Sequence, residues 1–447
     1  MFIDVKQRKQ NLLKLKKSIL ENIDELYNAF VKDYNKCEFD VVSTEVGLVL
    51  NEIGYMIKHL SRLAKPKRVS TSIINFPSKG YLYSEPYGQV LIVAPWNYPF
   101  QLSMMPLVGA IAGGNTVVLK PSNYCPEVSN TIKKILSVFD ENYVKVVLGG
   151  REQNSKLFDQ KFDFIFFTGG TTVAKVLYEK ASQHLTPCVL ELGGKSPCIV
   201  DADANIDLAA KRVVWGKYLN AGQTCVAPDH VYVHESVKEK FLECVVKYIN
   251  KFYYNEEGVL TESFPFIIND KHVARLKGLI DKDKLYFGGK TNGRCMEPTV
   301  LTDVTWNDAV MGEEIFGPIM PVLTFENLAG LIDEIKSHEK PLALYYFGSN
   351  KKTEKCVLNS LSFGGGCIND TIMHLTEEKL PFGGVGLSGM GSYHGKKSFE
   401  TFTHQKSVLK KSTHIDLPIR YMPHSKWKSA LAKIIFGIKN KKDETKK

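Results

Sequence analysis

The chain has 447 residues, which is too many for one ordinary hydrophobic core, so we expect two or three domains. Hydrophobic residues at 44% and charged residues at 24% are typical of a soluble globular protein. The formal net charge of +10 would suit nucleic acid, but much of the excess lies at the chain ends and no aromatic-and-basic motif accompanies it. We therefore expect no nucleic-acid partner.

The N-terminal segment and the cysteines bear on location. The segment from Lys6 to Lys17 is lysine-rich and lacks the apolar run of a signal peptide, and no apolar run of the sequence reaches membrane-spanning length. Nine cysteines are scattered without close pairs, which predicts reduced thiols and a cytoplasmic location. Cys-x-x-Cys and His-Glu-x-x-His motifs are absent, so we expect no metal site.

In chain order, the pattern begins with helices and continues as alternating strands and helices. Residues 3–64 carry apolar side chains at near-helical spacing, and residues 65–84 suit a connector or an edge hairpin. Short apolar runs then recur at helix-length intervals, first at 90–94, 116–119, 144–148, 162–167 and 197–200, and again at 231–234, 266, 285–287, 322–325 and 344–347. This alternation predicts an α/β fold with two parallel-sheet domains that meet near the Glu191–Gly194 turn.

Cys225 is the first candidate for chemistry. It lies in 220–227 among small, turn-forming and hydroxyl residues, where a substrate can approach the thiol closely. A core cysteine would more usually have bulky apolar neighbours. The segment therefore favours a nucleophilic cysteine, with an ordinary core thiol as the alternative.

Two other motifs could supply partners for this thiol. Glu191 opens a segment whose two glycines let the backbone approach another element closely, so its carboxylate could reach a nucleophile or a water. The alternative is a solvated glutamate at a strand end. Asn97 stands between two prolines and among three aromatic residues, so its buried amide either completes the turn or donates to a developing oxyanion.

Three positions could bind a phosphate or a ribose. The strand at 162–167 runs into Gly169 and Gly170 and then a helix start, where backbone N–H groups suit a phosphate. No third glycine follows, so a plain tight turn stays open. Lys120 ends the strand at 116–119, where ligands of α/β sheets bind, and Glu314 lies in the turn-rich segment 312–318. For both side chains, a surface position is the alternative.

Together these motifs resemble the aldehyde dehydrogenases, in that family's order along the chain. The resemblance runs from 95–97 through 167–171, 191–195 and 222–225 to 314–318. The segments 381–386, 388–399 and 402–405 are similar to the class 3 branch, as is the short stretch before Trp96.

The resemblance implies an activity and a role for each matched residue. Cys225 would attack the aldehyde, Asn97 would hold the oxyanion with the Cys225 N–H, and Glu191 would activate the water that hydrolyses the thioester. NAD or NADP would accept the hydride. The implied cofactor residues are Lys120 at the adenosine ribose, Gly169 and Gly170 near the pyrophosphate, Glu314 and Phe316 at the nicotinamide ribose, and Trp96 in the aromatic lining.

The implied substrate is a medium- or long-chain aliphatic or an aromatic aldehyde, oxidised to the acid. One alternative keeps Cys225 but transfers the acyl group to coenzyme A, and another is a non-catalytic scaffold held at a membrane. One position departs from the family: Asn123 stands where a glutamate often chelates the adenosine ribose and repels a 2′-phosphate. We interpret this change as permitting NADP.

The resemblance also divides the chain. It implies a Rossmann-like dinucleotide-binding domain at 1–68 and 87–193, a catalytic domain at 194–392, and a small β-hairpin oligomerisation element at 69–86 and 399–417 that forms a homodimer. The remainder, 418–447, is a basic tail.

The basic tail carries apolar side chains at helical spacing with lysines around them. The apolar residues are Trp427, Leu431, Ile434, Ile435 and Ile438, and the lysines are Lys426, Lys428, Lys433, Lys439, Lys441 and Lys442. This pattern predicts an amphipathic helix that lies either on an anionic membrane surface, as a peripheral contact, or on the protein's own surface.

Overall fold

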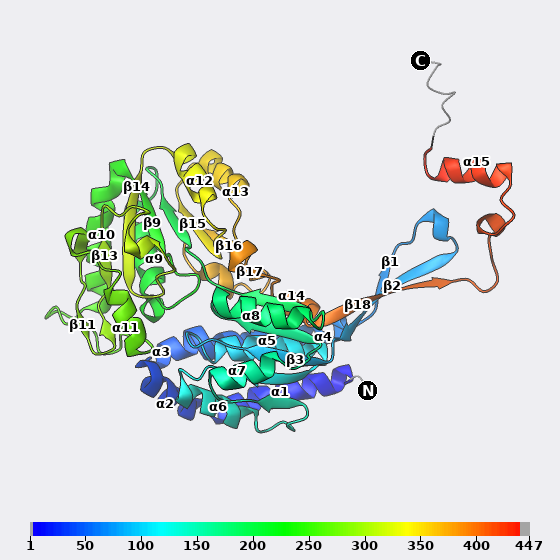
Figure 1. Cartoon of the computed structure of the whole chain (residues 1–447), viewed down its shortest axis with the longest axis horizontal. Helices are drawn as coiled ribbons and strands as arrows, with labels where there is room; N and C mark the ends of the chain where they lie inside the picture. Colours follow the sequence, from blue (N-terminus) through cyan, green and yellow to red (C-terminus); the bar gives the residue numbers. More distant parts are fainter. Residues whose placement is uncertain (1–2, 439–447) are drawn as a thin grey trace, which may run out of the picture. The chain divides into compact units, whose positions relative to one another are not determined.

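The computed structural model describes residues 3–438, which form two compact units (Figure 1). The first unit comprises the residues up to 63 together with 86–403, and the second comprises 64–85 together with the residues from 404 onward. Lys439, Lys441 and Lys442 lie outside the described residues. Among residues 3–438, we find no helix whose length and hydropathy would let it cross a membrane.

The N-terminal part of the first unit is helical, as predicted for residues 3–64. Its helices are α1 (Val5–Glu21), α2 (Ile23–Tyr34), α3 (Glu38–Val41) and α4 (Gly47–Leu63), and a π-helical turn at Val42–Val46 joins α3 to α4. The predicted apolar face is the buried one, because Leu12, Leu15 and Ile19 are fully buried. Single π-helical turns inside helices occur frequently at functional sites.

A six-stranded sheet forms the first α/β layer. Its order is β17-β7-β6-β3-β4-β5, in which β3 (Gln89–Val93), β4 (Thr116–Lys120), β5 (Val144–Val146), β6 (Phe164–Thr168) and β7 (Cys188–Glu191) are parallel and β17 (Gly389–Met390) is antiparallel. The connecting helices are α5 (Gln101–Gly113), α6 (Pro126–Leu136), α7 (Arg151–Phe158) and α8 (Thr171–Ser182). Helix α5 is apolar on every side and all of its residues are buried, since it packs between β3, β4 and α4.

A seven-stranded sheet forms the second layer, in the order β10-β13-β14-β9-β8-β15-β16. The strands are β8 (Pro197–Val200), β9 (His230–His234), β10 (Leu285–Phe287), β13 (Thr299–Leu301), β14 (Ile319–Phe325), β15 (Ala343–Phe347) and β16 (Gly365–Ile368). All but β10 are parallel, and all five residues of the central strand β15 are buried, as expected for a strand covered on both faces. The helices of this part are α9 (Ile206–Tyr218), α10 (Lys238–Tyr253), α11 (Asp270–Lys277), α12 (Leu328–Ser337) and α13 (Lys351–Ser360), and β11 (Thr291–Asn292) pairs with β12 (Cys295–Met296). Helix α14 (Lys396–Thr401) packs on α4 and α5 of the first part.

Two details of the strand prediction were wrong. Residues 197–200, which we grouped with the first series, belong to the second sheet, because the chain passes from β7 to β8 through the Gly193–Gly194 turn. Phe266 is not in a strand. Its N–H donates to the Tyr34 carbonyl at 2.8 Å, and its carbonyl accepts from the Gln223 side chain at 3.0 Å. Its backbone therefore bonds to other loops and does not pair with a neighbouring strand.

The second unit contains a three-stranded sheet and a helix. The sheet has the order β1-β2-β18, with β1 (Lys67–Val69), β2 (Ser78–Pro86) and β18 (Thr403–Lys411), and the helix is α15 (Lys426–Ile435). Of the predicted element at 399–417, Phe399 lies in helix α14 and strand β18 begins at Thr403. Strand β18 is an edge strand whose side chains are mostly exposed.

Candidate active site

The loop that carries Cys225 is bent sharply just after α9. Asn220, Ala221 and Gly222 have positive φ angles of 54°, 51° and 74°, which turn the chain away from the helix. At Gly222 a Cβ would lie 2.2 Å from the Gly317 carbonyl oxygen, so only glycine fits this approach. The turn leaves Cys225 half-buried in the wall of a cavity of about 340 Å³.

Side-chain hydrogen bonds hold this loop in place. Gln223 donates to the Asn220 carbonyl at 3.1 Å and accepts from the Ile268 N–H at 2.9 Å. The Tyr345 hydroxyl donates to the Val226 carbonyl at 2.5 Å, on the other side of Cys225. The sequence reasoning missed Gln223, although it directly precedes Thr224 and Cys225 in the motif.

Glu191 ends β7 and lines the same cavity as Cys225. Its backbone is fixed because its carbonyl accepts from the Gly169 N–H at 3.0 Å. Its side chain is buried, yet neither carboxylate oxygen has a hydrogen-bond partner. Burial raises the pKa of Glu191 well above the usual range for a glutamate, a perturbation that is typical of carboxyls in functional sites.

The Asn97 turn is joined to the Cys225 loop at two points. The Asn220 side chain donates to the Asn97 carbonyl at 2.8 Å, and the Tyr98 hydroxyl lies 2.7 Å from the Thr224 hydroxyl. Asn97 is itself buried, and from its turn Tyr98 lines the cavity. The structure therefore brings the segments of Cys225, Glu191 and Asn97 together.

The electrostatics of the cavity keep the thiol protonated. Burial, followed by the negative charges of Glu314 and Glu191, raises the pKa of Cys225 above the usual thiol value. A proton acceptor must therefore act before the thiol becomes a nucleophile. The unpartnered carboxylate of Glu191 lies in the same cavity.

A second cavity, of about 580 Å³, adjoins the same strand ends. Gly170 and Thr171 line it after β6, Gly193 and Gly194 line it after β7, and Glu314 lines it from the facing loop. The fit is close, because a Cβ at Gly193 would lie 2.0 Å from a Glu314 carboxylate oxygen. Burial and the nearby Asp229 raise the pKa of Glu314 to about 8.

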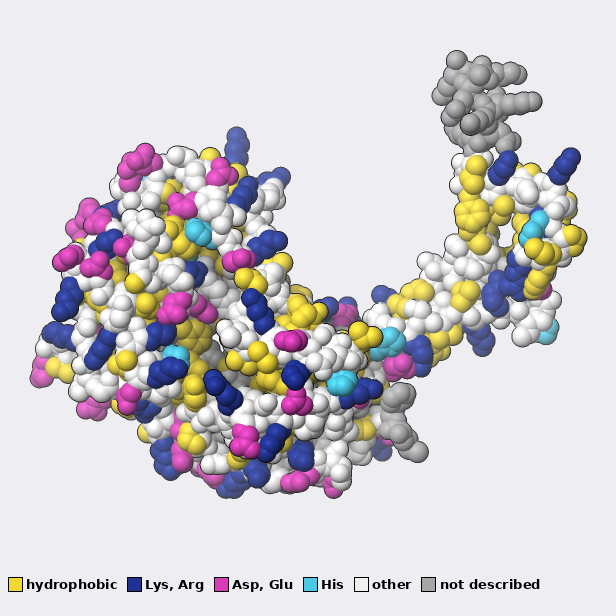
Figure 2. Space-filling model, in the orientation of Figure 1, with side chains coloured by type: hydrophobic (Ala, Val, Ile, Leu, Met, Phe, Trp, Pro, Cys, Tyr) yellow, Lys and Arg dark blue, Asp and Glu magenta, His cyan; other side chains and the backbone are white. Residues whose placement is uncertain are grey.

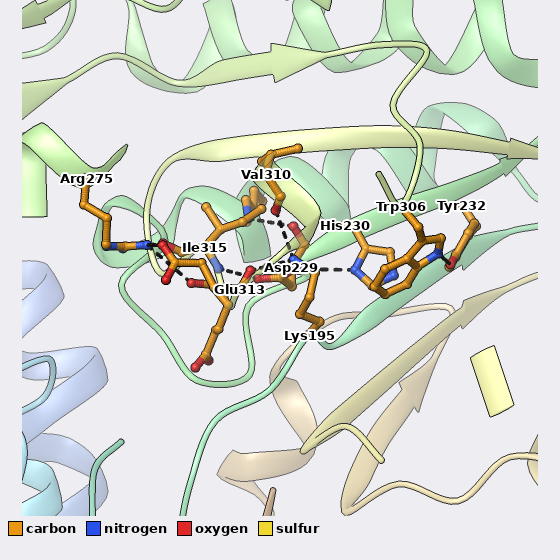
Figure 3. Close-up of polar contacts among 11 residues, drawn as sticks. Lys195, Asp229, His230, Tyr232, Arg275, Trp306, Val310, Glu313 and Ile315 are labelled. Atoms are coloured by element: carbon orange, nitrogen blue, oxygen red, sulfur yellow. Dashed lines mark hydrogen bonds and ion pairs between the residues drawn. The ribbon is translucent and has the colours of Figure 1, made fainter. Parts of the chain in front are cut away.

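Lys195 and Asp229 fix the loop that carries Glu314 (Figure 3). Lys195 lies 2.5 Å from the Asp229 carboxylate and donates to the carbonyls of Val310 and Glu313 at 3.1 and 2.8 Å. Asp229 also accepts from the Ile315 N–H at 2.8 Å. Arg275 pairs with Glu313 at 2.8 Å from the outer side. Lys195 ends the predicted motif at 191–195, and Asp229 follows the segment 220–227. No local sequence pattern indicates that these two side chains pair.

The remaining predicted cofactor residues lie at the sheet edge and in the facing loop. Lys120 ends β4, is buried, and donates to the Pro121 carbonyl at 2.7 Å, and burial lowers its pKa to about 8. Asn123 is exposed and its amide lies beside Gly150. The Trp96 and Phe316 rings meet edge-on at 5.2 Å.

Within residues 3–438, no three His, Cys, Asp or Glu side chains are grouped so that they could hold a metal ion.

Comparison with known proteins identifies the family. The aldehyde dehydrogenase family model matches residues 3–408. The chain belongs to the aldehyde dehydrogenase family. It is 46% identical to 4,4'-diaponeurosporen-aldehyde dehydrogenase of Staphylococcus aureus, over 94% of this chain and 93% of that protein. It is 43% identical to the dimeric, NADP-preferring aldehyde dehydrogenase of Rattus norvegicus, over 91% of this chain and 90% of that one.

Solved structures agree with this assignment. The substrate-bound state of Staphylococcus aureus AldH superposes with a TM-score of 0.94 at 45% identity, covering 97% of this chain and 95% of that one. The NAD+ complex of the Bacillus cereus aldehyde dehydrogenase superposes with a TM-score of 0.82 at 27% identity, covering 92% and 84%. The predicted α/β fold and enzyme class are confirmed: this aldehyde dehydrogenase oxidises aldehydes to acids with NAD or NADP. A coenzyme A-acylating enzyme and a non-catalytic scaffold gain no support from the comparisons.

The second cavity has the features that a dinucleotide needs. Helix α8 begins at Gly170 without a side-chain cap, so N–H groups of its first turn remain available to a phosphate. A Cβ at Gly170 would meet nothing within 4 Å, so the approach is open. The Glu314 carboxylate lines the same cavity and could accept from ribose hydroxyls, so this lining fits NAD or NADP.

Proposed function

We propose that Cys225 is the nucleophile of this aldehyde dehydrogenase, Glu191 its general base and Asn97 its oxyanion donor. The observation that carries this proposal is the buried Glu191 carboxylate, which has no hydrogen-bond partner and faces the cavity that Cys225 lines. Burying a carboxylate without hydrogen-bond partners costs folding free energy, so a functional role is the better explanation for Glu191.

Each step follows from these three residues. The Cys225 thiol loses its proton to solvent and its sulfur bonds to the aldehyde carbon, while the carbonyl oxygen becomes an oxyanion that accepts hydrogen bonds from the Asn97 amide and the Cys225 N–H. Lys120, Glu314 and the start of α8 would hold NAD(P), which would supply the acceptor for the hydride of the substrate carbon. Cys225 is then left as a thioester. Glu191 takes a proton from water, whose oxygen adds to the acyl carbon, and the C–S bond breaks to release the acid.

We propose an apolar aldehyde as the substrate, because apolar side chains dominate the wall of the Cys225 cavity. They are Phe39, Leu48, Leu102, Trp215, Leu219, Val226, Leu342, Ile372, Met373, Leu375 and Phe382. The relative of Staphylococcus aureus is named for 4,4'-diaponeurosporen-aldehyde.

A series of straight-chain aldehydes tests this substrate class. We expect kcat/KM to rise about threefold to fourfold for each added methylene until the cavity is filled, which is the factor that burial of a methylene provides. Benzaldehyde should be used better than glyceraldehyde, whose hydroxyls would have to be desolvated. Equal efficiency for glyceraldehyde and decanal would exclude an apolar substrate site.

We propose that Asn123 permits NADP as well as NAD. Its exposed amide, three residues beyond Lys120, places no negative charge near a 2′-phosphate. The substitution Asn123→Glu should lower kcat/KM for NADP roughly tenfold or more through like-charge repulsion and leave that for NAD nearly unchanged. Asn142→Glu, which adds the same charge at another exposed position, is the control. A wild-type enzyme that rejects NADP would refute the proposal.

We propose that α15 contacts anionic membranes. None of its described residues is buried, and Trp427, Ile434 and Phe436 are 56%, 76% and 65% exposed. Figure 2 shows apolar and basic side chains together over the segment that carries this helix. An exposed apolar stripe flanked by lysines suits the interface of a negatively charged bilayer.

Co-sedimentation tests the membrane contact. The full chain should bind vesicles that contain phosphatidylserine, and a chain ending at Pro423 should lose most of that binding. Ile434→Asp keeps the length and lysines but places a charge in the apolar stripe, so it should weaken binding too. Neutral phosphatidylcholine vesicles are the control. Equal binding by the full and shortened chains would exclude α15 as the contact.

We propose a homodimer that forms through the exposed edge strand β18. Unpaired backbone groups on an edge strand are a template for pairing with a second copy, and Val408 and Leu409 are exposed there at 38% and 47%. The dimeric relative of Rattus norvegicus supports this state.

A further inference from the structure

A buried ion pair lies beside the Cys225 cavity and has no role in the steps above. Lys36 follows α2, and Glu45 lies in the π-helical turn whose Ser43 and Thr44 line the cavity. The Lys36 Nζ is 3.0 Å from a Glu45 carboxylate oxygen, and the two side chains are 1% and 0% exposed. Removing two charges from water is costly, and apolar residues of similar volume often stabilise a fold as well or better. Stability alone does not explain this pair.

The Lys36 ammonium is directed at Tyr98. Its nitrogen lies 4.5 Å from the centroid of the Tyr98 ring and 5.4 Å from that of Phe30. An ammonium over an aromatic face is attracted to the ring's negative face, and the attraction is stronger in a site shielded from water. Lys36 therefore fixes the plane of the Tyr98 ring, which is 8% exposed and forms part of the cavity wall.

Glu45 holds the other end of the same segment. Its second carboxylate oxygen accepts from the Gln101 N–H at 2.8 Å, where α5 begins. Burial raises the pKa of Glu45, while Lys36 and the Gln101 N–H act in the opposite direction. The turn that contains Asn97 and Tyr98 is thus held at its ring by Lys36 and at its C-terminal end by Glu45.

The contacts continue from Tyr98 to the nucleophile. The Tyr98 hydroxyl is 2.7 Å from the hydroxyl of Thr224, and Thr224 directly precedes Cys225. Both hydroxyls are buried, so their mutual hydrogen bond is a defined one. A tilt of the Tyr98 ring would carry Thr224, and with it the thiol, out of position.

We propose that Lys36 and Glu45 are positioning residues for aldehyde oxidation: the pair fixes the Tyr98 ring, whose hydroxyl sets the position of Thr224 and so of the Cys225 thiol. This inference rests on the proposed role of Cys225 as the nucleophile.

A double-mutant cycle in the full-length enzyme tests it. Lys36→Met removes the ammonium, and Tyr98→Phe removes only the hydroxyl. Each should lower kcat by roughly 3- to 30-fold, the range expected from one buried cation–ring contact for Lys36→Met and from one buried hydrogen bond for Tyr98→Phe, and should slow alkylation of Cys225 by iodoacetamide in parallel. The KM for NAD should stay within about twofold, because the cofactor cavity is not lined by these residues.

The decisive result is the combination of the two substitutions. Because Lys36 acts through the Tyr98 hydroxyl, Lys36→Met should change kcat by less than about twofold in the Tyr98→Phe background. Lys32→Met, at an exposed lysine of α2, is the matched control and should leave kcat unchanged. The proposal would be overturned if Lys36→Met lowered kcat by the same factor with Tyr98 and with Phe at position 98. It would also be overturned if Lys36→Met lowered only the melting temperature and left kcat at the wild-type value.

A second variant keeps the test available if Lys36→Met does not fold. Lys36→Met combined with Glu45→Gln leaves no unpaired charge and retains an acceptor for the Gln101 N–H. It should fold with a melting temperature near that of the wild type and still show the lowered kcat, whereas a purely structural pair predicts full recovery. If Cys225→Ser remains active, the proposed function has failed. If Cys225→Ser is inactive but the Lys36 variants have normal kcat, only the positioning role has failed.

Discussion

Cys225→Ser is expected to lower aldehyde oxidation by at least about a thousandfold, as loss of a covalent nucleophile does in other enzymes. A serine hydroxyl is much less acidic than a thiol, so it supplies far less of the ionised nucleophile at neutral pH. The change is nearly isosteric, so the cavity wall and the bonds of Gln223 and Tyr345 to this loop remain. The readout is the rate of NADH or NADPH formation with decanal.

A matched substitution separates this effect from general damage. Cys356 is the exposed cysteine of α13, and Cys356→Ser should retain wild-type kcat. Both variants should melt at the wild-type temperature. A Cys225→Ser enzyme that keeps more than about a tenth of the wild-type rate would exclude covalent catalysis by this residue.

Glu191→Gln should lower kcat by roughly 100- to 10,000-fold, which is the usual contribution of a positioned general base. Glutamine keeps the size of the side chain but cannot take the proton from water. Because deacylation is the blocked step, the first turnover should still release about one NADH per active site before the reaction stalls. Glu179→Gln, at an exposed position on α8, is the control and should be fully active.

The pH dependence of the wild-type enzyme should follow the same carboxyl. Burial raises the pKa of Glu191, and only the deprotonated form is a base. Deacylation should therefore decline as the pH falls through that raised value, well above the ordinary glutamate range, and should recover as the pH rises. The residual deacylation rate of Glu191→Gln should not show this decline with pH. A wild-type deacylation rate that stays flat down to pH 5 would contradict the assignment.

Local patterns predicted much of the fold and the placement of the site. Strands β6 and β15 are buried on both faces, so their sequences are continuous apolar runs, and this pattern predicted them as strands. Lys120 could be placed because it follows such a run and so ends a strand. The short strand β7, which ends at Glu191, was not among the predicted runs. The strand predicted at Phe266 was wrong because a single buried apolar residue in a loop looks like a short strand in the sequence.

The contacts that hold the site were beyond any local pattern. Tyr98 and Thr224 are 126 positions apart, and Glu45 and Gln101 are 56 apart, so only the folded chain brings these polar groups together. The same holds for Lys195 and Asp229. Their charges look like ordinary surface charges in the sequence, and their burial depends on how β8, β9 and the Glu314 loop pack.

The central claim is that Cys225 carries the acyl group and Glu191 delivers the water that removes it. Intact-protein and peptide mass measurement of Glu191→Gln, after mixing with NAD and decanal, tests this most directly. The account predicts one decanoyl group per chain, located on the peptide that contains Cys225, with none found on Cys225→Ser treated in the same way. An unmodified Cys225 in the stalled Glu191→Gln enzyme, or an acyl group on another residue, would contradict it.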